Sequence, residues 1–254
     1  MPEALLRHVR GSITQIRHFR VRMTSRRVDF KALDTLAQAL QDLPPWQPFT
    51  PRQIRKALLS RSIRGKRGQL SWVILQVDGK DHVGMLEQSQ LLQEGDQIEL
   101  WLDSQDSLSP FLQALYLPRT QWLWAAPGMG ATAKQARLTR LLSLTSWLLF
   151  PIASGVILSI WVGVPQMQLL VWGFAVASLL MSWPGMLRSR KENAADERRT
   201  RQVLTQLGIP QPEHCDLFRH RVPVETPEGR TLPCNSLFAL DDARLAQQMR
   251  QMGA

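Results

Sequence analysis

The chain has 254 residues, 44% of them hydrophobic, and its 31 Lys and Arg outnumber 21 Asp and Glu to give a formal net charge of +10. Its two cysteines, Cys215 and Cys234, are too few for a disulfide scaffold and favour a reducing compartment. The excess of positive charge favours an anionic partner. Because the chain also carries a long apolar segment, we expect anionic lipid rather than nucleic acid.

Residues 1–126 predict a small antiparallel β-barrel-like domain with a helical insert at about 30–62. A first strand is expected between Val9 and Thr24, where apolar and polar residues partly alternate. The polar face of this strand is basic. It is either an ordinary solvated face or a stripe that binds lipid or another polyanion. The basic residues concerned are Arg17, His18, Arg20 and Arg22.

Two helices are expected in the insert. Asp29 is a good N-cap for a helix that Pro44-Pro45 ends, and Thr50-Pro51 starts a second helix that runs to about Ser62. The second helix has a narrow apolar face, and the basic residues continue through segment 52–67. This helix either lies on an anionic membrane or packs on the β domain, and the role of segment 52–67 stays open.

Short strands separated by tight turns follow the insert. Asp78-Gly79 is a strong hairpin signal, and Glu94-Gly95-Asp96 forms a second turn. Four to six such strands predict a small barrel or curled sheet. The expected strands are Leu70–Val77, His82–Leu86, Gln97–Leu102, Leu112–Leu117 and Gln121–Ala125.

The central segment Leu141–Leu187 contains no Asp, Glu, Lys, Arg or His. A bilayer core of about 30 Å takes about 20 apolar residues per helix, so this segment is long enough for two spans. Gly163–Gln168 has the composition of a tight turn. After a basic linker at 127–140, we therefore expect a transmembrane hairpin with spans at about 142–162 and 169–187. A buried helical pair of a soluble protein is the alternative.

The flanks of this hairpin are basic and its turn is uncharged. The positive-inside rule then predicts a two-pass bacterial inner-membrane protein with both termini in the cytoplasm. The expected membrane-interface anchors are Trp161, Trp183, Arg137, Arg140, Arg188, Arg190 and Lys191. Small and hydroxyl residues inside the spans either pack helices together or line a pore in a homo-oligomer. These candidates are Ser154, Gly155, Gly173, Ala177, Ser178 and Ser182.

Residues 188–254 predict a cytosolic helical tail. A helix is expected over Asn193–Leu207, where Gly208 closes it, and a short final helix over Asp241–Met252. The segment between them mixes turns with short apolar pieces.

Catalytic signatures are weak. The chain has neither a phosphate-binding glycine loop nor a G-x-S-x-G elbow. The group of His214, Cys215, His220 and Cys234 is either a metal site or, as favoured by the lack of paired C-x-x-C spacing, ordinary residues with free thiols. A Cys215 nucleophile lacks a convincing orienting carboxylate. We expect no catalytic residue, no cofactor, no metal and no enzymatic activity.

The order of these features resembles a family of bacterial type VI secretion effectors, which have an N-terminal β module, a central hydrophobic hairpin and a helical tail. The likeness is carried by Arg26–Phe30, Val77–Lys80, Glu94–Leu100, Leu207–Pro210 and Cys215–Leu217. The chain departs from the family at Leu33–Gly68, where such proteins often have a Gly/Ala-rich stretch. The resemblance implies an antibacterial protein delivered into target cells, with a secretion-system component and an immunity protein as partners. The predicted elements together indicate an α+β membrane protein.

The leading functional prediction is a membrane-inserting effector that dissipates ion gradients across the bacterial inner membrane through an oligomeric pore. The alternative is a resident inner-membrane accessory or regulatory protein that binds a partner through its soluble domains. A membrane-anchored enzyme is a third, less favoured class.

Overall fold

A computed structural model describes residues 6–19, 29–64, 70–103, 111–126, 129–130, 194–225 and 231–241. The chain divides into two units, one made of Met1–Gly130 with Arg199–Ala254 and the other of Ala131–Arg198. The described strands of the first unit form one eight-stranded sheet in the order β3-β2-β1-β4-β5-β6-β8-β7. Each pair of neighbours in this order is antiparallel.

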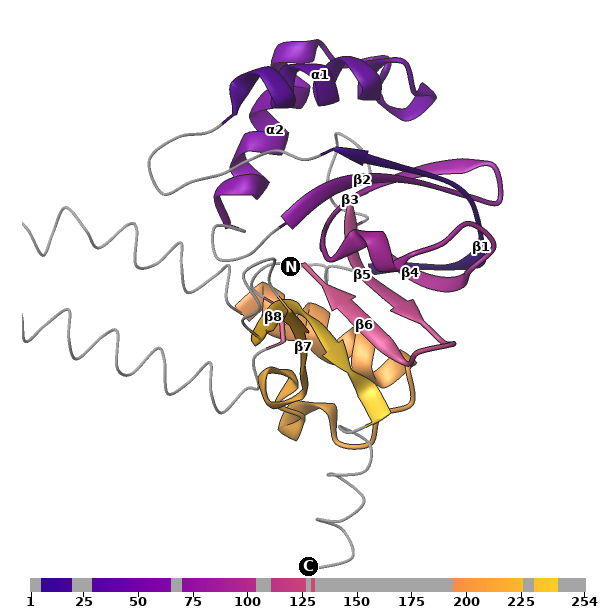
Figure 1. The fold of residues 1–254 in the computed structure, drawn as a ribbon, viewed down its shortest axis with the longest axis vertical. Coiled ribbons are helices and arrows are strands. Elements are labelled where there is room, and N and C mark those ends of the chain that lie inside the picture. The colour runs from indigo at the N-terminus through magenta and orange to yellow at the C-terminus, as the bar shows by residue number, and fades with distance from the viewer. Residues whose placement is uncertain are drawn as a thin grey trace, which may run out of the picture. The chain divides into compact units, whose positions relative to one another are not determined.

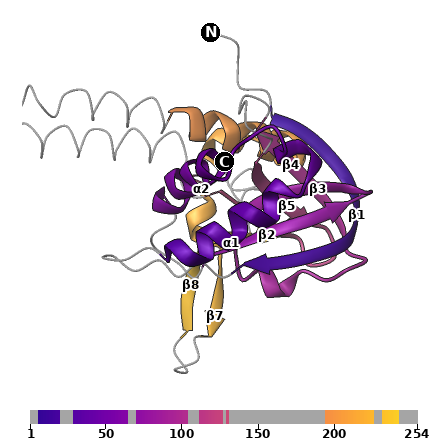
Figure 2. The ribbon, with the colours of Figure 1, turned by 90° about the horizontal axis from the view of Figure 1, so that it is seen from above.

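The long strand β1 (Leu6–Phe19) makes the sheet curl. Its first half, Leu6–Ser12, pairs with β4 (Gln97–Asp103), and its second half pairs with β2 (Leu70–Val77) after an irregularity near Ile13. Figure 2 shows the resulting bend of this indigo strand. Because one bent strand belongs to two halves of the sheet, β2 and β4 can face each other across an apolar interior.

The hairpin of β2 and β3 (Lys80–Glu87) and strand β5 (Leu112–Leu117) complete a small, partly open barrel. An isolated parallel bridge joins Val83 of β3 to Phe111, just before β5. Alternate residues of the strands fill the interior, as the period of two requires. This core includes Val73, Leu75, Leu86, Ile98, Leu100, Leu102, Leu115 and Leu117.

Helices α1 (Phe30–Gln41) and α2 (Pro51–Arg64) form a cap, which we call the helical cap, on the outer side of β2 and β3 (Figure 1). Asp29 caps α1 by accepting from the Ala32 backbone N–H at 3.0 Å, and a 3-10 turn at Pro44–Trp46 follows α1. Thr50 and Gln53 exchange hydrogen bonds as a capping box at the start of α2. The apolar faces of both helices pack on the sheet. The contacting residues are Leu33, Leu36, Leu40, Trp46, Ile54, Leu58, Trp72, Ile74, Val83 and Phe111.

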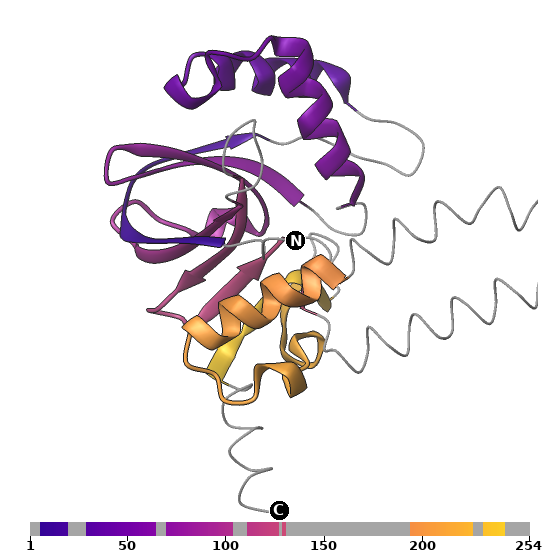
Figure 3. The ribbon, with the colours of Figure 1, turned by 180° about the vertical axis from the view of Figure 1, so that it is seen from behind.

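The C-terminal segment extends the sheet. Strand β8 (Thr231–Ala239) pairs with β6 (Trp122–Ala125) on one side and with β7 (Arg221–Glu225) on the other. The helix over 194–206 precedes them, and its residues from Arg199 onward belong to the first unit. Figure 3 shows this helix in orange beside the strands. Three short 3-10 turns, at Ser89–Leu91, Pro212–His214 and Leu217–His220, complete the described elements.

The fold class predicted from the sequence, an α+β membrane protein with a transmembrane hairpin and a helical C-terminal tail, is contradicted. The described chain is a mostly antiparallel sheet with short helices, and the supposed tail supplies strands β7 and β8. The physical reason is long-range pairing. The polar residues and prolines of 221–239 hide the strand pattern, and β8 joins β7 to the rest of the sheet by pairing with β6, more than a hundred residues earlier.

The predicted two-pass inner-membrane topology is corrected as well. Within the described ranges, no helix is both long enough and apolar enough to span a bilayer. The 12 residues of α1 and the 14 of α2 reach only about 18 and about 21 Å, short of a core of about 30 Å. The predicted spans at 142–162 and 169–187 lie outside the described residues.

Candidate functional site

The register of β1 against β4 places four side chains with polar groups on one face of the sheet. His8 lies directly opposite Trp101, and Arg10 lies opposite Glu99. Residues two apart on a strand share a face, so these two cross-strand pairs are neighbours. We call these four residues, together with Gln206 of the following helix, the His8 network.

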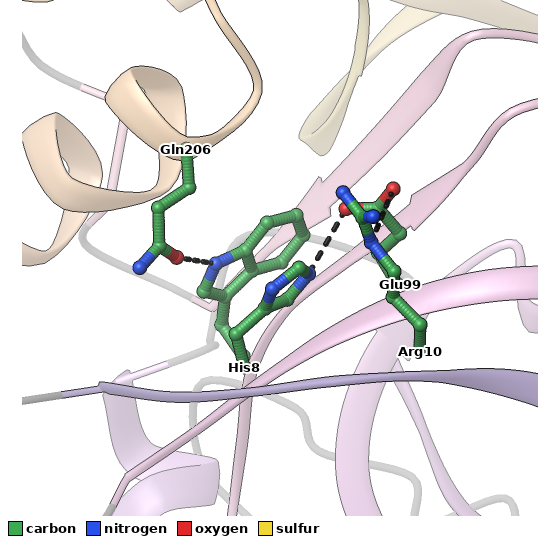
Figure 4. A network of polar contacts seen from close by, with 5 residues as sticks. His8, Arg10, Glu99 and Gln206 are labelled. Atoms are coloured by element: carbon green, nitrogen blue, oxygen red, sulfur yellow. Dashed lines mark hydrogen bonds and ion pairs between the residues drawn. The ribbon is translucent and has the colours of Figure 1, made fainter.

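Glu99 holds the two basic side chains of the His8 network (Figure 4). His8 Nε2 lies 2.9 Å from Glu99 Oε2, and Arg10 Nε lies 3.1 Å from Glu99 Oε1. The Glu99 side chain is 16% exposed and that of Arg10 is 69% exposed. The carboxylate is therefore mostly sheltered, while most of the guanidinium remains open to solvent.

The indole ring of Trp101 lies against the imidazole of His8. The two rings stack with their centroids 4.9 Å apart and their planes 15° from parallel. The Trp101 side chain is fully buried, and its indole Nε1 donates to Gln206 Oε1. Figure 4 shows Gln206 approaching this group from the helix. The indole is thus held by burial and by its hydrogen bond to Gln206. The imidazole of His8 is held in turn by stacking on this indole and by its contact with Glu99.

The helix that carries Gln206 is attached to the barrel by further side chains at helical spacing. Gln202 accepts from the backbone N–H of Leu6 at 3.3 Å and donates to its carbonyl at 3.4 Å. Arg199 pairs with the buried Asp103 at 2.9 Å. Arg199, Gln202 and Gln206 are three and four residues apart, so they share one side of the helix. This side therefore faces the start of β1 and the end of β4.

The His8 network has a definite hydrogen-bonding character. A carboxylate only accepts, so His8 Nε2 donates to Glu99, and in the neutral ring Nδ1 is then an acceptor. Arg10 uses Nε for Glu99, and its outer nitrogens are not part of that contact. The network can thus offer one acceptor and one charged donor group side by side. A histidine oriented by a carboxylate also occurs in catalytic triads, but there a nucleophile completes the site.

A second polar cluster is buried where β3 meets β8. Glu87 Oε2 accepts from the backbone N–H groups of Asn235 at 2.6 Å and Ser236 at 3.0 Å, and from the Ser236 hydroxyl at 3.2 Å. Burial, assisted by the charge of Glu87, raises the pKa of the Cys234 thiol to about 12. The thiol is therefore protonated near neutral pH and is a poor nucleophile. This cluster holds β8 in place.

His82 of β3 is a third unusual polar group. It is 6% exposed, and neither ring nitrogen has a hydrogen-bond partner among the described residues. Burial lowers the pKa of this imidazole, and the positive charges of Arg7 and Lys80 lower it further, against an opposing effect of Asp81. His82 is therefore neutral near pH 7.

The site residues predicted from the sequence lie outside the described part of the chain. This applies to the helix-packing or pore-facing candidates and to all the interface anchors. They are Ser154, Gly155, Gly173, Ala177, Ser178, Ser182, Trp161, Trp183, Arg137, Arg140, Arg188, Arg190 and Lys191.

The histidines and cysteines weighed as a metal site are described. Cys215 and Cys234 are both buried and belong to two different apolar clusters. Within the described ranges, no three His, Cys, Asp or Glu side chains are grouped as a metal site needs.

Two of the four residues of the basic stripe expected on the first strand, Arg17 and His18, are among the described residues. Arg17 lies 3.9 Å from Asp81, and His18 Nδ1 lies 3.0 Å from the Ser89 hydroxyl, so each has a partner on a different element. The remaining members, Arg20 and Arg22, lie outside the described residues. Arg17 and His18 therefore each have a partner within the fold.

The His8 network was missed by sequence reasoning. The available signal was the spacing of two in His8-x-Arg10 and in Glu99-x-Trp101. Glu99 and Trp101 lie on a predicted strand, whereas the predicted first strand began at Val9, one residue after His8. Only the register of β1 against β4, set across about ninety residues, brings these pairs together. Comparison of the chain with protein-family models, with curated proteins and with solved structures finds no match.

Proposed function

We propose that this protein is a non-enzymatic binding protein that docks a protein partner through the His8 network. The observation that carries the proposal is the arrangement around Glu99. This carboxylate fixes the imidazole of His8 and the guanidinium of Arg10 beside each other, while the Arg10 side chain stays 69% exposed.

The chemistry of the partner follows from these two groups. Arg10 favours a carboxylate, because guanidinium and carboxylate match in charge and in geometry. His8 Nδ1 favours a neighbouring N–H or hydroxyl donor. An acidic residue followed by backbone N–H groups supplies both, so an acidic segment of a protein is the expected ligand.

The fixed geometry supports binding rather than adventitious pairing. Stacking on a buried indole and a shared carboxylate leave little side-chain freedom to lose when a ligand binds. The predicted effector activity and its secretion-system, immunity and self-association partners stay predictions. An immunity protein with an acidic segment would satisfy the present proposal and that resemblance together.

The proposal can be tested by selecting random peptides displayed on phage against the immobilised full chain. We expect the selected peptides to be enriched in Asp and Glu. Their Kd should rise roughly 10-fold or more in Arg10→Gln, since a hydrogen bond to a charged group is worth about 1.5–3 kcal/mol. Glu99→Gln should weaken binding too, because it releases Arg10 and His8.

Arg219→Gln is a matched control. The Arg219 side chain is also 69% exposed, and its Nε also pairs with a carboxylate, that of Asp216 at 3.3 Å. Peptide binding should be unchanged in this variant. Selected peptides without acidic residues, or equal losses in Arg10→Gln and Arg219→Gln, would contradict the proposal.

A further inference from the structure

The helical cap turns one face toward the sheet and another toward solvent. Ile54 and Leu58 of α2 are fully buried in the cluster with Trp72 and Phe111, so its narrow apolar face is occupied. These two side chains are therefore not available to a membrane or partner. What the cap offers outward is its polar side, together with one aromatic ring.

That ring belongs to Phe30, at the start of α1. Phe30 is 54% exposed, and it is the one exposed large hydrophobic residue in the described ranges. Lys31 beside it is also exposed. Because residues three or four apart share a helix face, Phe30 and Lys31 lie on the side of α1 that carries Asp34.

An ion pair joins this side of α1 to α2. Arg55 Nη1 lies 3.1 Å from Asp34 Oδ1. Arg52 is three residues before Arg55, and Lys56 is four residues after Arg52, so the exposed cations of α2 continue the same region. We call Phe30, Lys31, Arg52, Arg55 and Lys56 the basic cap surface.

Carboxylates offset this charge only partly. Asp34 is engaged by Arg55, and Asp29 caps the N-terminus of α1. Asp42 is exposed at the other end of α1, twelve residues along the chain from Phe30. Within the described ranges, Lys31, Arg52 and Lys56 form no ion pair. The basic cap surface therefore carries an excess of positive charge together with one exposed aromatic ring.

We propose that the basic cap surface binds an anionic phospholipid surface. Lys and Arg attract acidic headgroups, and an exposed aromatic ring inserts at the boundary between headgroups and acyl chains. The lipid layer presents diffuse negative charge, which suits long cationic side chains that have no fixed hydrogen-bond geometry. This inference is independent of the proposed docking at the His8 network.

Nucleic acid fits the basic cap surface less well. Binding of single strands uses a series of aromatic side chains on which bases stack, whereas Phe30 is a single ring. Small five-stranded barrels that bind oligonucleotides use the face of their second and third strands. In this protein, that face of β2 and β3 is covered by α1 and α2.

The test is co-sedimentation of the full chain with vesicles of phosphatidylcholine alone or with 30% phosphatidylglycerol. We expect binding to the anionic vesicles that weakens from 0.1 to 0.5 M salt. Each basic residue near such a surface contributes about 1 kcal/mol, or roughly fivefold. Lys31→Gln, Arg52→Gln and Lys56→Gln together should weaken binding roughly 100-fold. Phe30→Ala should weaken it separately.

Arg219→Gln serves again as the control for loss of one exposed positive charge, and its binding should stay close to that of the parent chain. Equal binding to neutral and anionic vesicles would overturn the proposal, as would an unaffected triple variant. A single-stranded oligonucleotide or an acidic peptide that binds the basic cap surface more tightly than the anionic vesicles do would overturn it too. Failure of vesicle binding would leave the His8 network proposal standing, because that proposal is tested by peptide binding to the Arg10 variant.

Discussion

His82 shows how one buried side chain can make stability depend on pH. Above its ordinary pKa of 6.5, the imidazole is neutral in both the folded and the unfolded chain and adds no pH dependence. Below that value, the unfolded chain binds a proton that the folded chain resists, because burial lowers the folded pKa. The free energy of unfolding therefore falls as the pH drops from 6.5 toward the lowered value.

We predict that His82→Leu makes the protein less sensitive to acid. Leucine fills a similar volume without two unpaired nitrogens, and each buried unpaired polar group costs about 1–3 kcal/mol. Urea unfolding at pH 7.5, 6.5 and 5.5 should show a smaller loss of stability in the variant. His18→Gln, at an exposed position of β1, is the control. An unchanged pH slope in His82→Leu would exclude this origin.

At the scale of elements, the helix over 194–206 is fastened to the barrel by side chains rather than by a backbone ladder. Gln202 supplies one acceptor and one donor to the backbone of Leu6, so its carboxamide acts like one residue of a neighbouring strand. Val203 and Leu204 on the same helix are buried in the cluster with Trp101 and Phe238. The start of β1 thus depends on this helix.

Gln202→Ala should loosen the start of β1 without unfolding the sheet. Losing the two bonds removes about 1 kcal/mol locally, so hydrogen exchange at Leu6 and its neighbours should accelerate roughly fivefold. Thr205→Ala is the matched control, because the Thr205 hydroxyl only donates within the helix, to the Arg201 carbonyl. If both variants exchange alike, Gln202 does not support β1.

The elements that sequence reasoning found are those with local signals. Strands Leu70–Val77 and Leu112–Leu117 occur at the predicted bounds, and both helix starts at Asp29 and Thr50 are confirmed. The turn at Asp78-Gly79 has positive φ at both residues, as its sequence indicates. In each case, alternation, a cap or a turn within a few residues determines the structure.

The elements that it missed depend on distant partners. Strand β8 contains Pro233 and the polar pair Asn235 and Ser236, whose N–H groups are satisfied by Glu87 about 150 residues earlier. No pattern within a few residues of β8 indicates that Glu87 is its partner. The His8 network has the same origin, because His8 and Glu99 meet only through the register of two separated strands.

For the whole molecule, the important feature is that Gly130 and Thr200, on either side of segment 131–198, are in contact. The Gly130 backbone N–H donates to the Thr200 hydroxyl at 3.1 Å. Gly130 has a φ of +107°, which other residues rarely adopt, and a Cβ there would lie only 3.2 Å from the Phe238 ring. The first unit is thus continuous in space across a gap in the sequence. Met129 is buried in its core, so the folded unit extends to this junction.

We predict that the first unit folds when residues 131–198 are replaced by a short Gly/Ser linker of about six residues. A short flexible loop costs little closure entropy when its ends are already adjacent. The shortened chain should unfold cooperatively in urea and protect amides of β6 and β8 from hydrogen exchange. Removing residues 199–254 as well should abolish that cooperativity, because β8 and its helix are lost. A shortened chain without a cooperative transition would contradict the prediction.

The pairing of β6 with β8 can form only late in synthesis, because the two strands are far apart in the sequence. Trp122 and Trp124 reach the outside of the ribosome long before Ala239 and Leu237, with which they pair. At about 5–20 residues per second, the roughly 110 intervening residues take about 6–22 s to make. During that interval, the edge of β6 exposes unpaired backbone and aromatic rings in the nascent chain. A ribosome-bound chaperone, or slow access of other chains to that edge, would then govern how much protein reaches the folded state.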